Sequence, residues 1–156
     1  MIAVLQRAAS ACVRVEGQAV GEIGAGLLIL LGVGVEDTEA DAEVLAAKIV
    51  KSRIFCDEND KMNLSVKDVG GGALVVSNFT LMANYAHGNR PDYMAAARPE
   101  QAEPLYEYFV SLLKKELTRV ETGRFGAEMR VLLEGDGPVT IVMDSRVLRE
   151  RRGKKQ

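Results

Sequence analysis

The chain has 156 residues, a formal net charge of −2 at pH 7, and two cysteines without metal-ligand spacing, which argues against a zinc site or a disulfide framework. Its length is enough for one domain with a real core, roughly 68 to 70% of the unfolded surface being buried. It has no run of eighteen apolar residues and no basic segment after Met1, so the sequence predicts no membrane span, no secretory signal and a cytoplasmic protein.

The positive charge is concentrated at the end of the chain. Residues 145–156 hold six basic side chains against Glu150 alone, so this segment carries +5 and leaves −7 for the rest. Such an arm can neutralise the phosphates of RNA, or it can be a solvated tail that only aids solubility. We therefore divide the chain into a single domain, 1–145, and a basic C-terminal tail, 146–156.

The first third of the chain predicts a β-meander. Apolar and charged residues alternate over 13–16, which is the period of a half-buried strand that also includes Ile2 and Val4. After a turn at Gly17, residues 20–23 form a short return strand. The unbroken apolar run 27–33 suits a strand buried on both faces.

Two helices and further strands follow. Thr38 can cap a helix that has acidic residues in its first turn and Lys48 and Lys51 in its last, as the helix dipole favours. A strand begins at Ile54, and another covers 73–76 after three glycines. The loop 82–99 is long enough to be functional. The second helix, 100–117, has an apolar face formed by Leu105, Tyr108, Phe109, Leu112 and Leu113.

The hexapeptide from Gly135 to Thr140 separates two final apolar runs, 129–133 and 139–143. An Asp-Gly pair between apolar runs is typical of a hairpin turn. A Gly-Pro bond also tolerates the cis form, and Gly137 has no Cβ, so Gly137 and Pro138 could present bare carbonyls as a rigid recognition edge. Both interpretations are open from the hexapeptide alone.

Side-chain nucleophiles normally need an adjacent base, and the one histidine, His87, lies in the middle of the long loop. This argues against a serine-type triad. The hydroxyls of Ser77 and Thr80 fit an ordinary strand end. Alternatively, the backbone amides of residues 78–80 could stabilise an oxyanion where the strand stops pairing.

Several separated motifs, in the same order, resemble the D-aminoacyl-tRNA deacylases, also called D-tyrosyl-tRNA(Tyr) deacylases. The resemblance runs from one end of the chain to the other, and the hexapeptide is one of its motifs. The matching segments are Met1 to Arg7, Gly26 to Leu28, Lys48-Ile49, Arg53 to Phe55, Lys61 to Asn63, Ser77 to Leu81, Gly88 to Pro91, Thr122 to Gly126, and Asp136 to Thr140. The family usually has Gln where Asn78 stands and Asn where Gly135 stands.

The resemblance implies an α/β fold with a mostly antiparallel, barrel-like β-sheet and two main packed helices, assembled as a homodimer. It also implies hydrolysis of the ester that joins a D-amino acid, or glycine mischarged on tRNA(Ala), to the 3′-terminal adenosine of tRNA. The implied partners are such tRNAs and a second copy of the chain, without DNA, membrane, metal or cofactor.

The resemblance assigns catalysis to the segment Ser77, Asn78, Phe79 and Thr80, and substrate binding to Arg7, Met129, Gly137 and Pro138. A cis Gly137-Pro138 element would enter the partner's site and hold the α-amino group, so that an L side chain collides with the wall. Arg7 would steady this edge. Since no base adjoins Thr80, we favour water assisted by the adenosine 2′-hydroxyl. The alternatives are a Thr-nucleophile esterase and a non-catalytic RNA-binding dimer.

Overall fold

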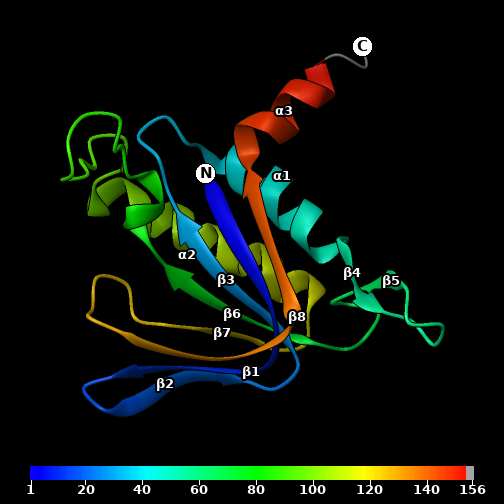
Figure 1. The fold of residues 1–156 in the computed structure, drawn as a ribbon. Coiled ribbons are helices and arrows are strands. Elements are labelled where there is room, and N and C mark those ends of the chain that lie inside the picture. The colour runs from blue at the N-terminus through cyan, green and yellow to red at the C-terminus, as the bar shows by residue number, and fades with distance from the viewer. Residues whose placement is uncertain (154–156) are drawn as a thin grey trace.

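The computed structural model describes residues 1–153, with side chains for residues 1–150. None of the helices in this part of the chain is long and apolar enough to cross a membrane. In chain order the elements are β1 (Ile2–Val15), β2 (Gln18–Ile23), β3 (Gly26–Gly32), α1 (Glu39–Val50), β4 (Arg53–Cys56), β5 (Met62–Ser65), β6 (Gly72–Ser77), the 3-10 turn η1 (Phe79–Met82), α2 (Pro99–Glu116), β7 (Val120–Thr122), β8 (Arg130–Asp144) and α3 (Ser145–Gly153) (Figure 1).

Strand β1 is the centre of the sheet and pairs along both edges. β8 runs antiparallel to its whole length on one side. On the other side, β3 pairs with its first half and β2 with its second half, also antiparallel. Each of these two strands is therefore a neighbour of β1 in the sheet, and the expected meander, in which β2 would pair with β3, is wrong.

The other half of the sheet is parallel. β6 runs parallel to β3, and β7 runs parallel to β6, so the sheet is mixed and the expectation of a mostly antiparallel sheet is wrong here. The chain passes through α1 and the β4–β5 pair between β3 and β6, and a crossover of that length lets two strands run in one direction. β3 and β6 are nearly continuous apolar runs, as is typical of strands in a sheet that is covered on both faces.

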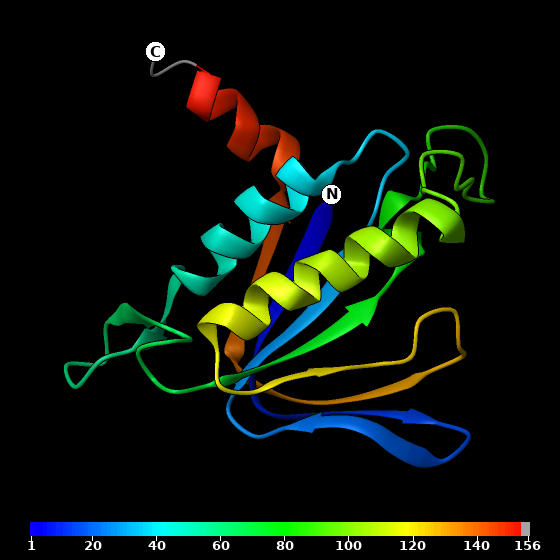
Figure 2. The same cartoon turned by 180° about the vertical axis from the view of Figure 1, so that it is seen from behind.

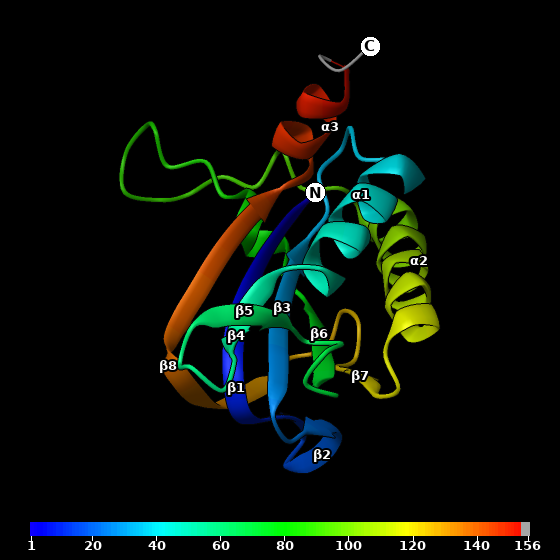
Figure 3. The same cartoon turned by 90° about the vertical axis from the view of Figure 1, so that its right-hand side faces the viewer.

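The sheet curls so strongly that it has two cores, which confirms the barrel-like shape. Helices α1 and α2 cover one face of the sheet (Figures 2 and 3), where Leu27 and Ile29 pack against them. The alternate residues, including Leu28 and Leu74, pack with Val13 inside the curl. Successive side chains of a strand point to opposite faces, so β3 supplies both cores.

The expected final hairpin is wrong as well, because β8 is one long strand. Both apolar runs of β8 pair in turn with β1 rather than with each other. Where the hexapeptide lies, a single residue of β1, Arg7, faces the four residues Asp136 to Val139 of β8. This bulge bends both strands sharply (Figure 1). The Asp-Gly signal therefore marks a bulge within the strand.

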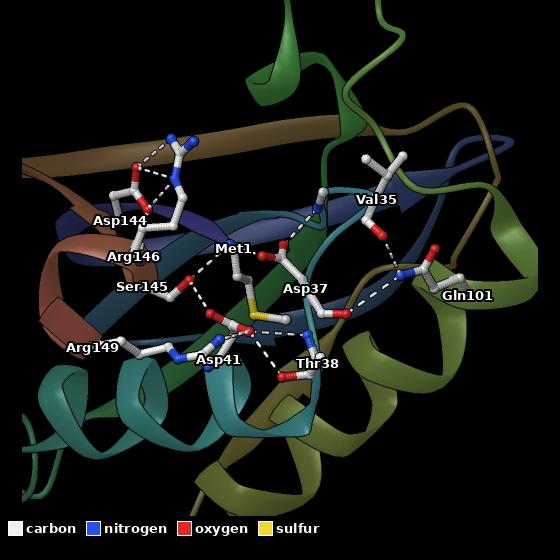
Figure 4. A network of polar contacts seen from close by, with 11 residues as sticks. Met1, Val35, Asp37, Thr38, Asp41, Gln101, Asp144, Ser145, Arg146 and Arg149 are labelled. Atoms are coloured by element: carbon white, nitrogen blue, oxygen red, sulfur yellow. Dashed lines mark hydrogen bonds and ion pairs between the residues drawn. The ribbon is translucent and has the colours of Figure 1, made fainter. Parts of the chain in front are cut away.

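The start of β1 and the start of α3 meet in a polar network (Figure 4). The buried Met1 amine forms an ion pair with Asp37 and donates to Ser145 Oγ over 2.8 Å. Ser145 in turn donates to Asp41 over 2.9 Å, and Arg149 donates to the same carboxylate over 2.9 Å. The network fixes the first turn of the tail against α1.

The same contacts alter the acidity of Asp41. Burial works to raise its pKa, but hydrogen bonds from Thr38, Ser145 and Arg149 outweigh burial and hold the pKa below its ordinary value. A carboxyl group with a lowered pKa stabilises the fold above its ordinary pKa. This contribution is lost as the pH falls through the folded-state value.

We expect Asp41→Asn to lower the free energy of unfolding by about 1–3 kcal/mol at pH 7, because it leaves buried donors without their charged acceptor. The difference from the wild type should shrink toward pH 3. Urea unfolding at both pH values measures it, with the exposed Glu58→Gln as the control. A difference that grows in acid would contradict this assignment.

The basic tail thus begins as a helix rather than at a break in the chain. Arg146 pairs with Asp144 and Arg149 with Asp41, so two of its cations are already neutralised within the chain. The side chains of the basic residues after Glu150 lie outside the part of the chain that the structure describes. The proposed RNA contact of the tail would depend on those residues.

Candidate active site

The end of β6 carries the segment that the sequence marks as catalytic. Asn78 leaves the strand and its backbone amide donates to the Leu31 carbonyl over 2.8 Å, so this amide is not free to bind an oxyanion. The next two backbone amides, of Phe79 and Thr80, stand at the start of the η1 turn. The first N–H groups of a helical turn have no carbonyl acceptor within that turn. The expected set of three backbone donors is therefore reduced to two.

A cavity of about 540 Å³ adjoins this segment. Its lining joins β3, the β6 end, the 93–97 segment, α2 and the loop before β8, which approach one another at one end of the molecule (Figures 1 and 2). The lining residues are Leu31, Val33, Ser77, Asn78, Phe79, Tyr93, Ala96, Ala97, Pro99, Ala102, Tyr106, Phe125, Gly126, Ala127 and Met129. Four predicted site residues, Ser77, Asn78, Phe79 and Met129, thus come together.

Aromatic rings shape the cavity. Phe79 meets Tyr93 edge to face, with ring centroids 5.1 Å apart. The ring centroids of Tyr106 and Phe125 are 5.7 Å apart. Tyr106 donates its hydroxyl to the Val75 carbonyl over 2.9 Å, and burial raises its pKa to about 12. Its proton therefore stays in place at neutral pH.

Among the residues that the structure describes, the lining contains no carboxylate, histidine, lysine, arginine or cysteine. Thr80 is exposed and lies outside the lining, although its neighbours line the cavity. Its hydroxyl donates to the Asn78 side-chain oxygen, which is an amide oxygen and a poor proton acceptor for catalysis. The cavity can thus hold an apolar group beside backbone donors, but it supplies no side-chain base.

The three remaining predicted positions, Arg7, Gly137 and Pro138, lie elsewhere in this chain. Gly137 and Pro138 are exposed in the β8 bulge, joined by a cis peptide bond as expected. In the sheet, Arg7 pairs with Leu27 of β3, and Leu27 pairs with Ala73 of β6. Ala73 is four residues before Ser77, which lines the cavity. Four strand residues span roughly 13 Å, so one chain does not bring the bulge to the cavity.

Arg7 is buried beneath the bulge. Its Nε donates to the Asp136 carbonyl over 3.2 Å and lies 3.1 Å from the Asp136 carboxylate. Its Nη1 donates to the Ile54 carbonyl of β4 over 2.8 Å. The guanidinium thus ties the Gly137-Pro138 bulge to the β4–β5 pair.

Sequence analysis missed the α2 residues of the site. It named Tyr108, which is half-buried, packs against the core and donates to Glu43 over 2.8 Å, but not the buried Tyr106. The buried face runs through Ala102, Tyr106, Phe109, Val110 and Leu113. These positions also repeat at helical spacing, so a buried face counted from Ala102 predicts Tyr106.

A family model described as "D-Tyr-tRNA(Tyr) deacylase" matches residues 4–144. Curated relatives named "D-aminoacyl-tRNA deacylase" include one from Koribacter versatilis, 56% identical over 94% of this chain and 98% of its own, and one from Thermosipho melanesiensis, 54% identical over the same shares.

Two solved structures share the fold. One, titled "c-Myc DNA Unwinding Element Binding Protein", has a TM-score of 0.88 at 41% identity. The other, titled "Structural Analysis of a probable eukaryotic D-amino acid tRNA deacylase", has a TM-score of 0.79 at 15% identity. Each alignment covers 92% of this chain and 98% of the other.

Proposed function

This chain belongs to the D-Tyr-tRNA(Tyr) deacylase family, and from this premise we propose that it hydrolyses the ester between a D-amino acid and the 3′-terminal adenosine of tRNA. The products are the free D-amino acid and tRNA. Glycine, which has no side chain, is accepted as well, including glycine mischarged on tRNA(Ala). The enzyme acts in the cytoplasm, where aminoacyl-tRNA is used.

The observation that carries this proposal is the cavity beside the Phe79 and Thr80 amides, whose lining has no base. In the proposed reaction, water attacks the ester carbonyl and the tetrahedral oxyanion accepts from these amides. The adenosine 2′-hydroxyl relays a proton from the attacking water to the departing 3′-oxygen. The protein supplies position and charge stabilisation rather than a covalent nucleophile.

The exclusion of L-amino acids is assigned to a second copy of the chain. In a homodimer, the partner's Gly137 and Pro138 would close the cavity and hold the substrate's α-amino group by main-chain carbonyls. The surface favours self-association, because β8 exposes Val131, Leu132, Leu133 and Val142, and Phe79 is 58% exposed at the cavity. Apolar area of this kind is typical of an interface.

Parallel incubation with D-Tyr-tRNA and L-Tyr-tRNA tests the proposal. We expect release of D-tyrosine and retention of the L-ester. A binding module would release neither amino acid, and this alternative is favoured by the 41% identical structure, which is described as a DNA-binding protein. A general esterase would release both.

The mechanism gives a separate expectation for Thr80. Thr80→Val removes the hydroxyl but keeps the shape, and loss of one neutral hydrogen bond should slow deacylation by only about tenfold or less. A substrate with 2′-deoxyadenosine should react about 10² to 10³ times more slowly, because it lacks the assisting group. Single-turnover rates measure both changes.

Thr80→Ser is the matched control, since it keeps a hydroxyl in place. If Thr80→Ser retained activity while Thr80→Val abolished it, and the 2′-deoxy substrate reacted normally, Thr80 would be the nucleophile and the water mechanism would be wrong.

A further inference from the structure

A smaller hollow of about 460 Å³ adjoins the cavity of about 540 Å³, which we call the main cavity. It lies between the β1–β2 turn at Glu16-Gly17 and the loop before β8, which are neighbours at the same end of the molecule (Figures 1 and 2). Ala127 lines both spaces. The two spaces are therefore adjacent.

Three arginines, Arg14, Arg124 and Arg130, line this hollow, and we call them the arginine cluster. Arg14 and Arg130 are direct cross-strand partners in the β1–β8 pair. Like charges that face each other across two strands oppose pairing of those strands. The Arg14–Arg130 pair thus has a cost in the stability of the β1–β8 pairing, and the fold alone does not explain why two arginines lie opposite each other.

The cost is not offset within the chain. Glu16 and Glu128 also line the hollow, but neither forms an ion pair with the arginine cluster. No hydrogen bond of the three guanidinium groups is recorded within the part of the chain whose side chains the structure describes. All three side chains are exposed, so their donors are available to an external anion.

The chemistry of the guanidinium group identifies the class of ligand. A planar fork of N–H donors binds phosphate oxygens in pairs, and three forks around one hollow suit successive phosphates of a chain. Single-stranded nucleic acid is bound in this manner, along a positively charged groove that tracks the backbone. The ester in the main cavity would be attached to such a strand.

We propose that the arginine cluster binds the ribose-phosphate backbone of the single-stranded 3′ end of the substrate tRNA, just before the terminal adenosine enters the main cavity. This proposal rests on the proposed function. It assigns affinity rather than chemistry to the cluster, because its residues lie outside the lining of the main cavity.

The test compares two substrates that share the ester. For Arg14→Gln/Arg130→Gln, KM for D-Tyr-tRNA should rise about tenfold with little change in kcat. The slope of log KM against log salt should fall by about 1.4, or 0.7 for each lost phosphate contact to a single strand. On 3′-O-D-tyrosyl adenosine, which has no phosphate, the double variant should match the wild type.

Arg53→Gln is the matched control, because Arg53 is an exposed arginine on β4 that lies outside the hollow and forms no ion pair with the side chains of residues 1–150. An unchanged KM and salt slope in the double variant would overturn the proposal, as would an equal loss on the adenosine ester or a change of oligomeric state in sedimentation. If the wild type failed to cleave either D-ester, the proposed function would fail instead.

Discussion

Gly137→Ala should lower the rate of D-Tyr-tRNA deacylation by about 10²-fold or more while the protein stays folded, because misplacing a binding group by about 1 Å has an effect of that size. A Cβ at this position would lie 2.9 Å from the Val139 nitrogen and 3.4 Å from the Arg7 guanidinium. Gly137 also has φ near +127°, a conformation that side chains disfavour. The bulge must therefore shift, and its carbonyls with it.

Gly135→Ala is the matched control, two residues away in the same strand. A Cβ there would meet nothing closer than 4.0 Å, so we expect near wild-type rates. Circular dichroism and sedimentation verify that both variants fold and assemble alike. Equal losses in the two variants would mean that this whole part of β8 is sensitive to substitution, and would remove the specific role of Gly137.

A mixing experiment tests whether the bulge acts in the partner's site. Ala127→Trp fills the main cavity from a surface turn and should inactivate its own subunit's cavity. When these chains are mixed with Gly137→Ala chains, a heterodimer regains one intact cavity facing one intact bulge only if the bulge acts in trans. Heterodimers that form without activity would mean that each chain builds its own site.

Arg7→Met should reduce kcat by about 10²-fold, because the bulge loses the donors that tie it to β4. Arg7→Lys should restore little, since a single ammonium cannot donate to the Asp136 and Ile54 carbonyls with the geometry of a guanidinium fork. Steady-state kinetics at D-Tyr-tRNA concentrations above KM measure the effect.

The control for Arg7→Met is a measurement of its folding stability. The methionine side chain keeps most of the buried contact area, so urea unfolding should show a small change beside the large change in kcat. If kcat and the folded fraction fell in parallel, Arg7 would be a fold residue without a role in positioning the bulge.

The sequence was most informative where local chemistry decides the structure. Thr38 and the acidic first turn place the start of α1 correctly, because a helix end is fixed by its own capping groups. The ends of α2 fall within one residue of the expected 100–117. The resemblance assigned four of the residues that line the main cavity, namely Ser77, Asn78, Phe79 and Met129.

It was least informative where distant segments choose their partners. An apolar run has the same pattern whether its neighbour is parallel or antiparallel, so β3 gave no sign of its pairing with β6. Likewise, an Asp-Gly pair between two apolar runs suits a hairpin and a bulge equally well. Only the register with β1 distinguishes them, and register is a property of two strands together.

The pairing of β1 with β8 also constrains how the chain folds. These are the first and the last strands, so one edge of β1 has no partner until residues 130–144 exist. Synthesis at about 5–20 residues per second leaves that edge open for on the order of 10 s. Contacts this far apart in sequence make folding slow and leave an exposed edge available for aggregation. The Arg7–Asp136 contact that supports the bulge therefore forms only after β8 is made.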